Sequence, residues 1–199
     1  MRSNICKIDK GTNDLAAILK ECERVAEYGQ LTHRQYLHLR LLCEEMDGML
    51  PNIIDEFVGE FWIELEDGTC TVNASIIIPE FNSTKKEELI GIARNKKNAA
   101  AVGIVGKIRD AIENVLLISK ENDAHYPMSP AFNLGTGYCE GVDYSYLWSL
   151  EQYRSNINDT DTADEWDELE KSVIASVADD VIVGVKGNRA SIKIVKKFA

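Results

Sequence analysis

The chain of 199 residues has 45% hydrophobic residues, a net charge of −11 and an isoelectric point near 4.8. This length and apolar content are enough for one domain whose core needs no disulfide or metal. The acidity disfavours nonspecific binding to nucleic acid and to anionic lipid, since both require a positive surface. No segment reads as a signal peptide or reaches the roughly 18 apolar residues of a membrane span, so we expect a cytoplasmic protein.

The first fifty residues predict two helices. The first begins near Asp14 and is stopped by Gly29. The second begins at Thr32, because Thr32-x-x-Gln35 has the form of a capping box, and Pro51 is expected to end or kink it. The apolar stripe of this second helix consists of residues at helical spacing, namely Leu39, Leu42, Met46, Met49 and Leu50.

The middle of the chain changes from period two to helical spacing. Alternating apolar residues over 61–65, the dipeptide Asp67-Gly68 and a β-rich run over 69–78 predict an antiparallel hairpin. Two helices are then expected over 84–93 and 99–118. The stretch that follows, to residue 142, contains two of the four prolines and is expected to be a long surface loop.

The last third predicts helices over 144–157 and 162–177 and a closing hairpin. Its strands are expected over 181–185 and 190–198, on either side of a turn at 186–188. Two hairpins separated by helices favour a single α+β domain over residues 1–199. We expect a two-layer α/β sandwich with a mixed, mainly antiparallel sheet and helices on one face.

Adjacent carboxylates near the end of the second helix are the best candidates for chemistry. Glu44 or Glu45 could lie at the edge of the core, where a carboxylate with a raised pKa could orient or deprotonate a water molecule. Adjacent helical residues point about 100° apart, so one of the two at most is expected to act. The alternative is that both lie on a solvated face of the helix.

A cationic segment stands out in this acidic chain. Five cationic residues fall within the sixteen positions of 94–109 and include Lys96, Lys97 and Lys107. Gly103 and Gly106 lie in the same stretch, where exposed backbone N–H groups could meet a phosphate. The alternatives are glycines that let two helices pack closely and lysines that are solvated.

Other polar groups give weaker indications. Asp179-Asp180 could bind a cation, but a connector between helix and strand also uses such residues to form its turn. The five cysteines are widely spaced with no C-x-x-C pair, so we expect reduced thiols and predict no metal site. The aromatic residues of 144–148 and Trp166 are interpreted as core anchors, with a partner-binding surface as the alternative.

The order of elements, together with the helix segment 41–50, resembles the histidine-kinase-type (GHKL) ATPase superfamily, especially its small anti-sigma-factor kinases. In that family an equivalent helix carries a Glu-x-x-x-Asn box, followed by a hairpin, an Asp-x-Gly-x-Gly loop, a second glycine box and a final hairpin. Glu44 lines up with the family's glutamate, and Gly103-x-x-Gly106-Lys107 with the second glycine box. Residues 119–162 form an insertion. The whole chain also resembles bacterial proteins labelled as ATP-binding.

The resemblance implies a GHKL fold that binds ATP with Mg²⁺, with Glu44 as catalytic carboxylate. Lys96, Lys97, Gly103, Gly106 and Lys107 would face the phosphates. The chain departs from the family at two points: Gly48 stands where the family places the asparagine that holds Mg²⁺, and 79–84 lacks the Asp-x-Gly-x-Gly loop that reads adenine.

Two hypotheses follow from these matches and departures. The first is a degenerate nucleotide-binding regulatory or signalling protein with a protein partner and with weak ATP hydrolysis or none. The second is an interaction module that binds no nucleotide and works as a homodimer or with another protein, using the insertion and its aromatic residues. Whether the chain is an enzyme is left open between them.

Overall fold

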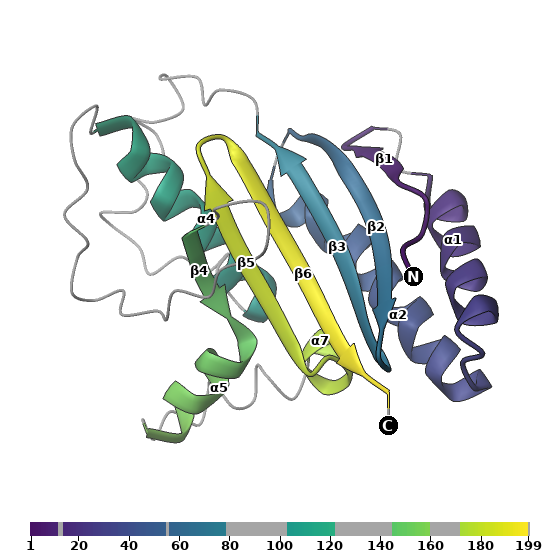
Figure 1. The fold of residues 1–199 in the computed structure, drawn as a ribbon. Coiled ribbons are helices and arrows are strands. Elements are labelled where there is room, and N and C mark those ends of the chain that lie inside the picture. Colours follow the sequence, from purple (N-terminus) through teal and green to yellow (C-terminus); the bar gives the residue numbers. More distant parts are fainter. Residues whose placement is uncertain (12–13, 55, 79–102, 122–144, 160–171, 199) are drawn as a thin grey trace.

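The computed structural model describes residues 1–11, 14–54, 56–78, 103–121, 145–159 and 172–198. In this part of the chain six strands form one sheet, and helices packed behind it make a second layer (Figure 1). All pairings between the described strands are antiparallel. The predicted α+β class is therefore confirmed. The prediction of a mixed sheet is wrong for these six strands.

The strand order is β1-β2-β3-β6-β5-β4. The two predicted hairpins form the centre of the sheet, because β3 of the first pairs with β6 of the second. The first hairpin turns through Asp67 and Gly68, whose φ values are 47° and 75°, and the second through Gly187 at 59°. The strands span Cys6–Asp9 (β1), Val58–Glu66 (β2), Thr69–Ile77 (β3), Ser145–Ser149 (β4), Asp180–Lys186 (β5) and Arg189–Lys197 (β6).

The described helices span Leu15–Tyr28 (α1), His33–Ile53 (α2), Gly103–Glu121 (α4), Leu150–Asp159 (α5) and Val173–Val177 (α7). The capping box of α2 is confirmed, since the Thr32 hydroxyl accepts from the Gln35 backbone N–H and the Gln35 side chain accepts from Thr32 N. The helix continues through Pro51 to Ile53, past the end expected near Leu50. Pro51 removes one backbone N–H donor, and the buried side chains of Leu50 and Ile53 on either side of it pack the last turn against the core.

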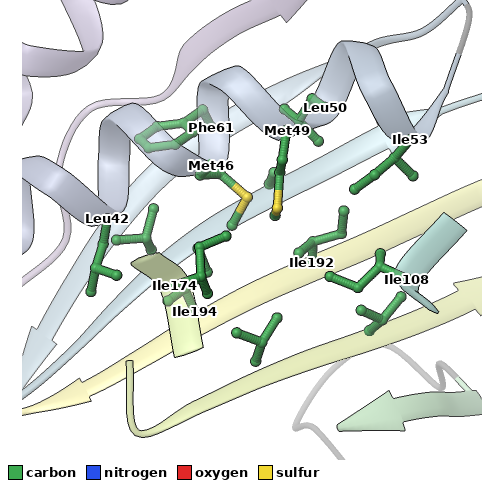
Figure 2. Close-up of a cluster of buried hydrophobic side chains, with 14 of the residues drawn as sticks. Leu42, Met46, Met49, Leu50, Ile53, Phe61, Ile108, Ile174, Ile192 and Ile194 are labelled. Carbon is green, nitrogen blue, oxygen red and sulfur yellow. The ribbon is translucent and has the colours of Figure 1, made fainter. Parts of the chain in front are cut away.

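The core lies between α2 and the sheet. Figure 2 shows Leu42, Met46 and Met49 of α2 reaching toward Ile192 and Ile194 of the central strand β6. Side chains from α4 and α7 close the same cluster beside them. The apolar stripe predicted for α2 therefore faces the sheet, and burial of its residues is what fixes the helix against it.

Two elements differ from the predictions. The segment expected as one helix over 144–157 is strand β4 followed by helix α5, and β4 pairs with β5 with a register shift between Tyr146 and Trp148. The short strand β1 was not predicted. The predicted helix over 84–93, the first half of the predicted helix over 162–177 and most of the predicted loop over 119–142 lie outside the described residues.

Candidate functional site

Glu44 and Glu45 lie on different sides of α2. Leu42 and Met46 point into the core, and at about 100° per residue Glu44 lies about 160° away from both. Its Oε1 accepts from Arg40 Nε at 2.9 Å, and its side chain is 35% exposed. Glu44 is therefore paired on the outer face of the helix, on the side away from the sheet.

Glu45 lies on the flank of α2 that is remote from α1. Cys43, which contacts Cys22 of α1, marks the α1 flank, and Glu45 lies about 160° around the helix from Cys43. Figure 1 places α1 and α4 on opposite sides of α2, so half-buried Glu45 lies on the α4 side. Of the two carboxylates, Glu45 is therefore the one on the side of α2 that faces α4, the helix that carries Gly103, Gly106 and Lys107.

One turn after Glu44, α2 carries a glycine with free space around it. A Cβ atom on Gly48 would meet nothing within 4 Å, so packing does not require glycine here. One turn further on, Asn52 Nδ2 donates to the Gly48 carbonyl at 2.9 Å. The outer stripe of α2 thus carries a carboxylate that is paired with Arg40 and an amide that is bonded to the helix backbone.

The predicted glycine pair lies in the first turn of α4. Gly103 begins the helix with φ +83°, a backbone conformation that favours glycine, and a Cβ there would meet nothing within 4 Å. Gly106 is buried, and α4 packs against α2. The N-terminal N–H groups of a helix can bind an anion, so this turn can take a phosphate. Lys96 and Lys97 lie outside the described residues.

Lys107 already has an aromatic neighbour. Its Nζ lies 5.5 Å from the centroid of the Tyr153 ring on α5, a cation–π contact. The Tyr153 ring in turn lies 5.9 Å from that of Trp148 on β4. Strand β4 and helix α5 therefore lie beside the first turns of α4, and Tyr153 contacts a lysine that was predicted to face a phosphate. Both aromatic side chains pack against the core, which agrees with the core-anchor interpretation for Trp148.

Apolar side chains fill the layer between these two helices and the sheet. Figure 2 shows Met49 and Ile53 of α2, Ile192 of β6 and Ile108 of α4 gathered in one cluster. All four are at least 97% buried. A polar ligand at this place would therefore bind along the outer rim of α2 and the N-terminal turn of α4, above this apolar layer.

Three buried thiols lie together where α1, α2 and β3 meet. Cys22, Cys43 and Cys70 are fully buried, and the four described cysteines are free, as predicted. Burial, together with the hydrogen bond to Cys22, raises the pKa of Cys43 well above its usual value, and burial raises the pKa of Cys70 to about 12. Since the thiolate is the nucleophile, these cysteines pack the core rather than react.

Asp179 and Asp180 are used in backbone structure. Asp179 accepts from Lys197 N at 2.5 Å and Lys196 Nζ at 3.2 Å. Asp180 Oδ1 accepts from Glu151 N at 3.0 Å, so it binds the N-terminal turn of α5. Both carboxylates thus bind backbone of neighbouring elements, Asp179 at the end of β6 and Asp180 at the start of α5. Among the described residues no group of three or more His, Cys, Asp and Glu side chains is arranged to hold a metal ion.

Sequence reasoning missed two neighbours of the candidate residues. Arg40 is one turn before Glu44, a spacing typical of helical ion pairs, so this pair was detectable. Tyr153 falls in the segment expected as a helix over 144–157, and only the fold of β4 and α5 brings it to Lys107. Among the described helices, none has the length and apolarity that crossing a bilayer requires. Comparison of the chain with protein-family models, curated proteins and solved structures finds no match.

Proposed function

We propose that the chain is a regulatory protein built on a degenerate GHKL-type nucleotide-binding fold, which holds ATP weakly and hydrolyses it slowly or not at all. One observation carries this proposal: α2 and α4 pack side by side on one face of a sheet whose closing hairpin pairs with β3. The GHKL resemblance implies this sequence of helix, hairpin, glycine-opened helix and final hairpin. The first turn of α4, with Gly103 and Gly106, is the phosphate-binding element.

The residues on α2 do not fit the family's Mg²⁺ site. Gly48 offers no side-chain oxygen, and the Asn52 amide donates to the Gly48 carbonyl. Glu44 is paired with Arg40. Because position 48 lacks the asparagine by which the family holds Mg²⁺, we assign no hydrolytic step, and the proposed activity is nucleotide-dependent regulation of a protein partner.

Thermal unfolding with and without ATP tests the proposal. A Kd of about 0.1 mM would, at about 10 mM ATP, stabilise the folded chain by about 2.7 kcal/mol. We expect Lys107→Ala to remove most of this stabilisation. Lys20→Ala, which removes an exposed cation on α1, is the matched control and should keep it. Unfolding that is unchanged by ATP in the wild-type chain would reject the nucleotide site.

The contact between Lys107 and Tyr153 provides a second readout. Lys107 has to leave the Tyr153 ring in order to reach a phosphate, and a cation–π contact contributes about 0.5–1 kcal/mol at an exposed site. Tyr153→Leu should therefore tighten ATP binding about two- to fivefold. Tyr153→Phe keeps the aromatic ring and should leave ATP binding unchanged. A Leu variant that binds ATP no better than the Phe variant would remove Lys107 from the site.

A second candidate function, an interaction module without nucleotide, is favoured by a different observation. Lys107 lies against Tyr153, Glu44 is paired with Arg40, and apolar side chains fill the layer between the sheet and the helices α2 and α4. In this case the described part of the insertion, β4 and α5, is a fixed part of the fold. An absence of any ATP effect in the unfolding experiment selects this function.

A further inference from the structure

The face of the sheet that points away from the helices has an uneven distribution of charge. Phe61 and Ile63 of β2 and Ile192 of β6 point toward the helices, so the residues that alternate with them point to the other face. On this face the described β1 and β2 carry the anions, and β5 and β6 carry the cations. The anions are Asp9, Glu60, Glu64 and Glu66, and the cations are Lys186, Arg189, Lys193 and Lys197.

The two halves also contain charges of the other sign, but fewer. Lys7 and Arg2 lie in the acidic half, where Arg2 lies 4.6 Å from the Trp62 ring centroid and 3.7 Å from Glu64. In the cationic half Asp180 is occupied by backbone N–H groups. Glu60, Glu66, Arg189 and Lys197 are all exposed. The acidic and cationic stripes are therefore separated by the width of β3.

The centre of this face suits close approach of a second sheet. β3 contributes only small or short polar side chains to the middle of the face, at Thr69, Thr71, Asn73 and Ser75. Apolar side chains lie around them, including half-buried Trp62, Ile77, Ile182 and Val195. A sheet face exposed only to water is expected to be polar at these positions, so this face has the composition of a contact surface.

We propose that this face packs on the same face of a second copy of the chain. The two copies are related by a twofold axis that lies between the two sheets, above β3 and parallel to it. The register supports this axis, because Glu66 and Lys197 lie in one row on either side of Thr69. Trp62 and Lys193 flank Asn73 in the same way. Rotation about an axis parallel to the strands places β2 of one copy on β6 of the other.

The alternative in-plane axis does not give this match. An axis perpendicular to the strands places β2 on β2 and β6 on β6, so that like charges meet. The axis along β3 instead places Glu66 opposite Lys197 and Trp62 opposite Lys193, twice in each dimer. Charge complementarity of this kind determines register and partner choice. The charge match therefore favours a second copy of the chain as the partner on this face, with β2 of one copy parallel to β6 of the other.

The size of the face indicates a reversible dimer. Strands of nine residues are about 30 Å long and four strands cover about 19 Å, so the flat footprint is on the order of 600 Å². Stable interfaces bury roughly 800 Å² per partner. Because opposite charges contribute, association should weaken as ionic strength rises. The interface is remote from the helical face, so it does not depend on the proposed nucleotide function.

Charge reversal with mixing tests the dimer. The wild-type chain should sediment as a concentration-dependent dimer at low salt. Glu60→Lys with Glu66→Lys makes both stripes cationic, and Arg189→Glu with Lys197→Glu makes both anionic. Each double variant alone should dissociate at least tenfold more readily than the wild type, and an equimolar mixture of the two should recover dimers. Far-UV circular dichroism confirms that each variant is folded.

A matched control separates this face from general charge effects. Glu27→Lys reverses an exposed charge on α1 and should leave dimerisation unchanged. A wild-type chain that stays monomeric at all concentrations and low salt overturns the proposal. So does a dimer that both double variants leave intact, or a mixture that fails to associate when its two components are folded and monomeric.

Discussion

Replacing Gly48 by alanine tests whether the fold requires a glycine at this position of α2. Gly48 is exposed in the interior of α2, and a Cβ there would meet nothing within 4 Å. Glycine in a helix interior is about 1 kcal/mol less favourable than alanine. The bond from Asn52 goes to the Gly48 carbonyl, so the substitution retains it. Gly48→Ala should therefore stabilise the chain by about 1 kcal/mol.

Urea unfolding followed by circular dichroism detects this change. With an m value of about 2–3 kcal/mol/M, the midpoint should rise by about 0.4 M at unchanged m. In thermal unfolding the midpoint should rise by about 2–4 °C. An unchanged or lower midpoint would mean that Gly48 has a structural role in α2, and the reasoning from its open surroundings would be refuted.

The companion variant Gly48→Asn introduces the residue that the GHKL resemblance places at this position. Asparagine is only a few tenths of a kcal/mol better than glycine in a helix, so the gain in stability should be smaller than for alanine. If the missing amide is what separates this helix from a Mg²⁺ site, ATP binding by Gly48→Asn should become dependent on Mg²⁺. ATP binding that ignores Mg²⁺ in this variant would assign the defect to another residue.

Three further substitutions test the fold around the site. Thr32→Ala removes the capping box of α2 and should lower the unfolding free energy by about 1 kcal/mol in urea titrations; an unchanged value would contradict the capping role. Gly59→Ala would place a Cβ 2.4 Å from the Ser75 carbonyl oxygen and should lower the unfolding free energy by roughly 1–3 kcal/mol. A neutral result would mean that β2 and β3 can move apart at this point without loss of stability. Burial raises the pKa of Glu21, but hydrogen bonds from Asn4 and the Arg24 ion pair outweigh it, so the net pKa is lowered. The resulting stability is present above pH 4.5 and is lost as the pH falls toward the folded-state pKa. Glu21→Gln should therefore flatten the acid limb of the unfolding curve, and a limb as steep as that of the wild type would count against this assignment.

The parts of the fold that sequence predicted well are those with local chemical signals. Thr32 and Gln35 begin α2, and Asp67-Gly68 makes the first hairpin turn, because capping and positive φ are properties of a few adjacent residues. The stripe of α2 was predictable for the same reason, since helical spacing alone places it on one face. These signals define α2 and the two hairpins without any knowledge of the rest of the chain.

The parts that sequence could not predict depend on pairing between distant segments. Strand β4 has only five residues, and its apolar residues also fit helical spacing, so its pairing with β5 decides its structure. The same applies to the four residues of β1 on the edge of the sheet. Pro51 gave a helix-ending signal, but the burial of Leu50 and Ile53 on either side of it holds the last turn of α2, and this packing is a property of the folded chain.

For the candidate residues, the sequence predicted the elements that carry them better than the directions in which their side chains point. Gly103 begins a helix with positive φ, as a glycine-opened helix requires. Glu44 was preferred over Glu45 by the resemblance, yet the rotation of α2 sets Glu44 on the outer face with Arg40. Spacing determines which residues share a face, but the flank to which α4 packs is a property of the folded chain.

Calorimetric titration of ATP, once with Mg²⁺ and once with EDTA, tests the central claim most directly. A degenerate fold that keeps the phosphate-binding turn of α4 and lacks the family's cation ligand on α2 should bind ATP with the same Kd, within about threefold, under both conditions, and should release ADP slowly or not at all. An absence of heat at millimolar ATP would contradict nucleotide binding. Tight binding that requires Mg²⁺ and is followed by ADP release would instead contradict the degeneracy.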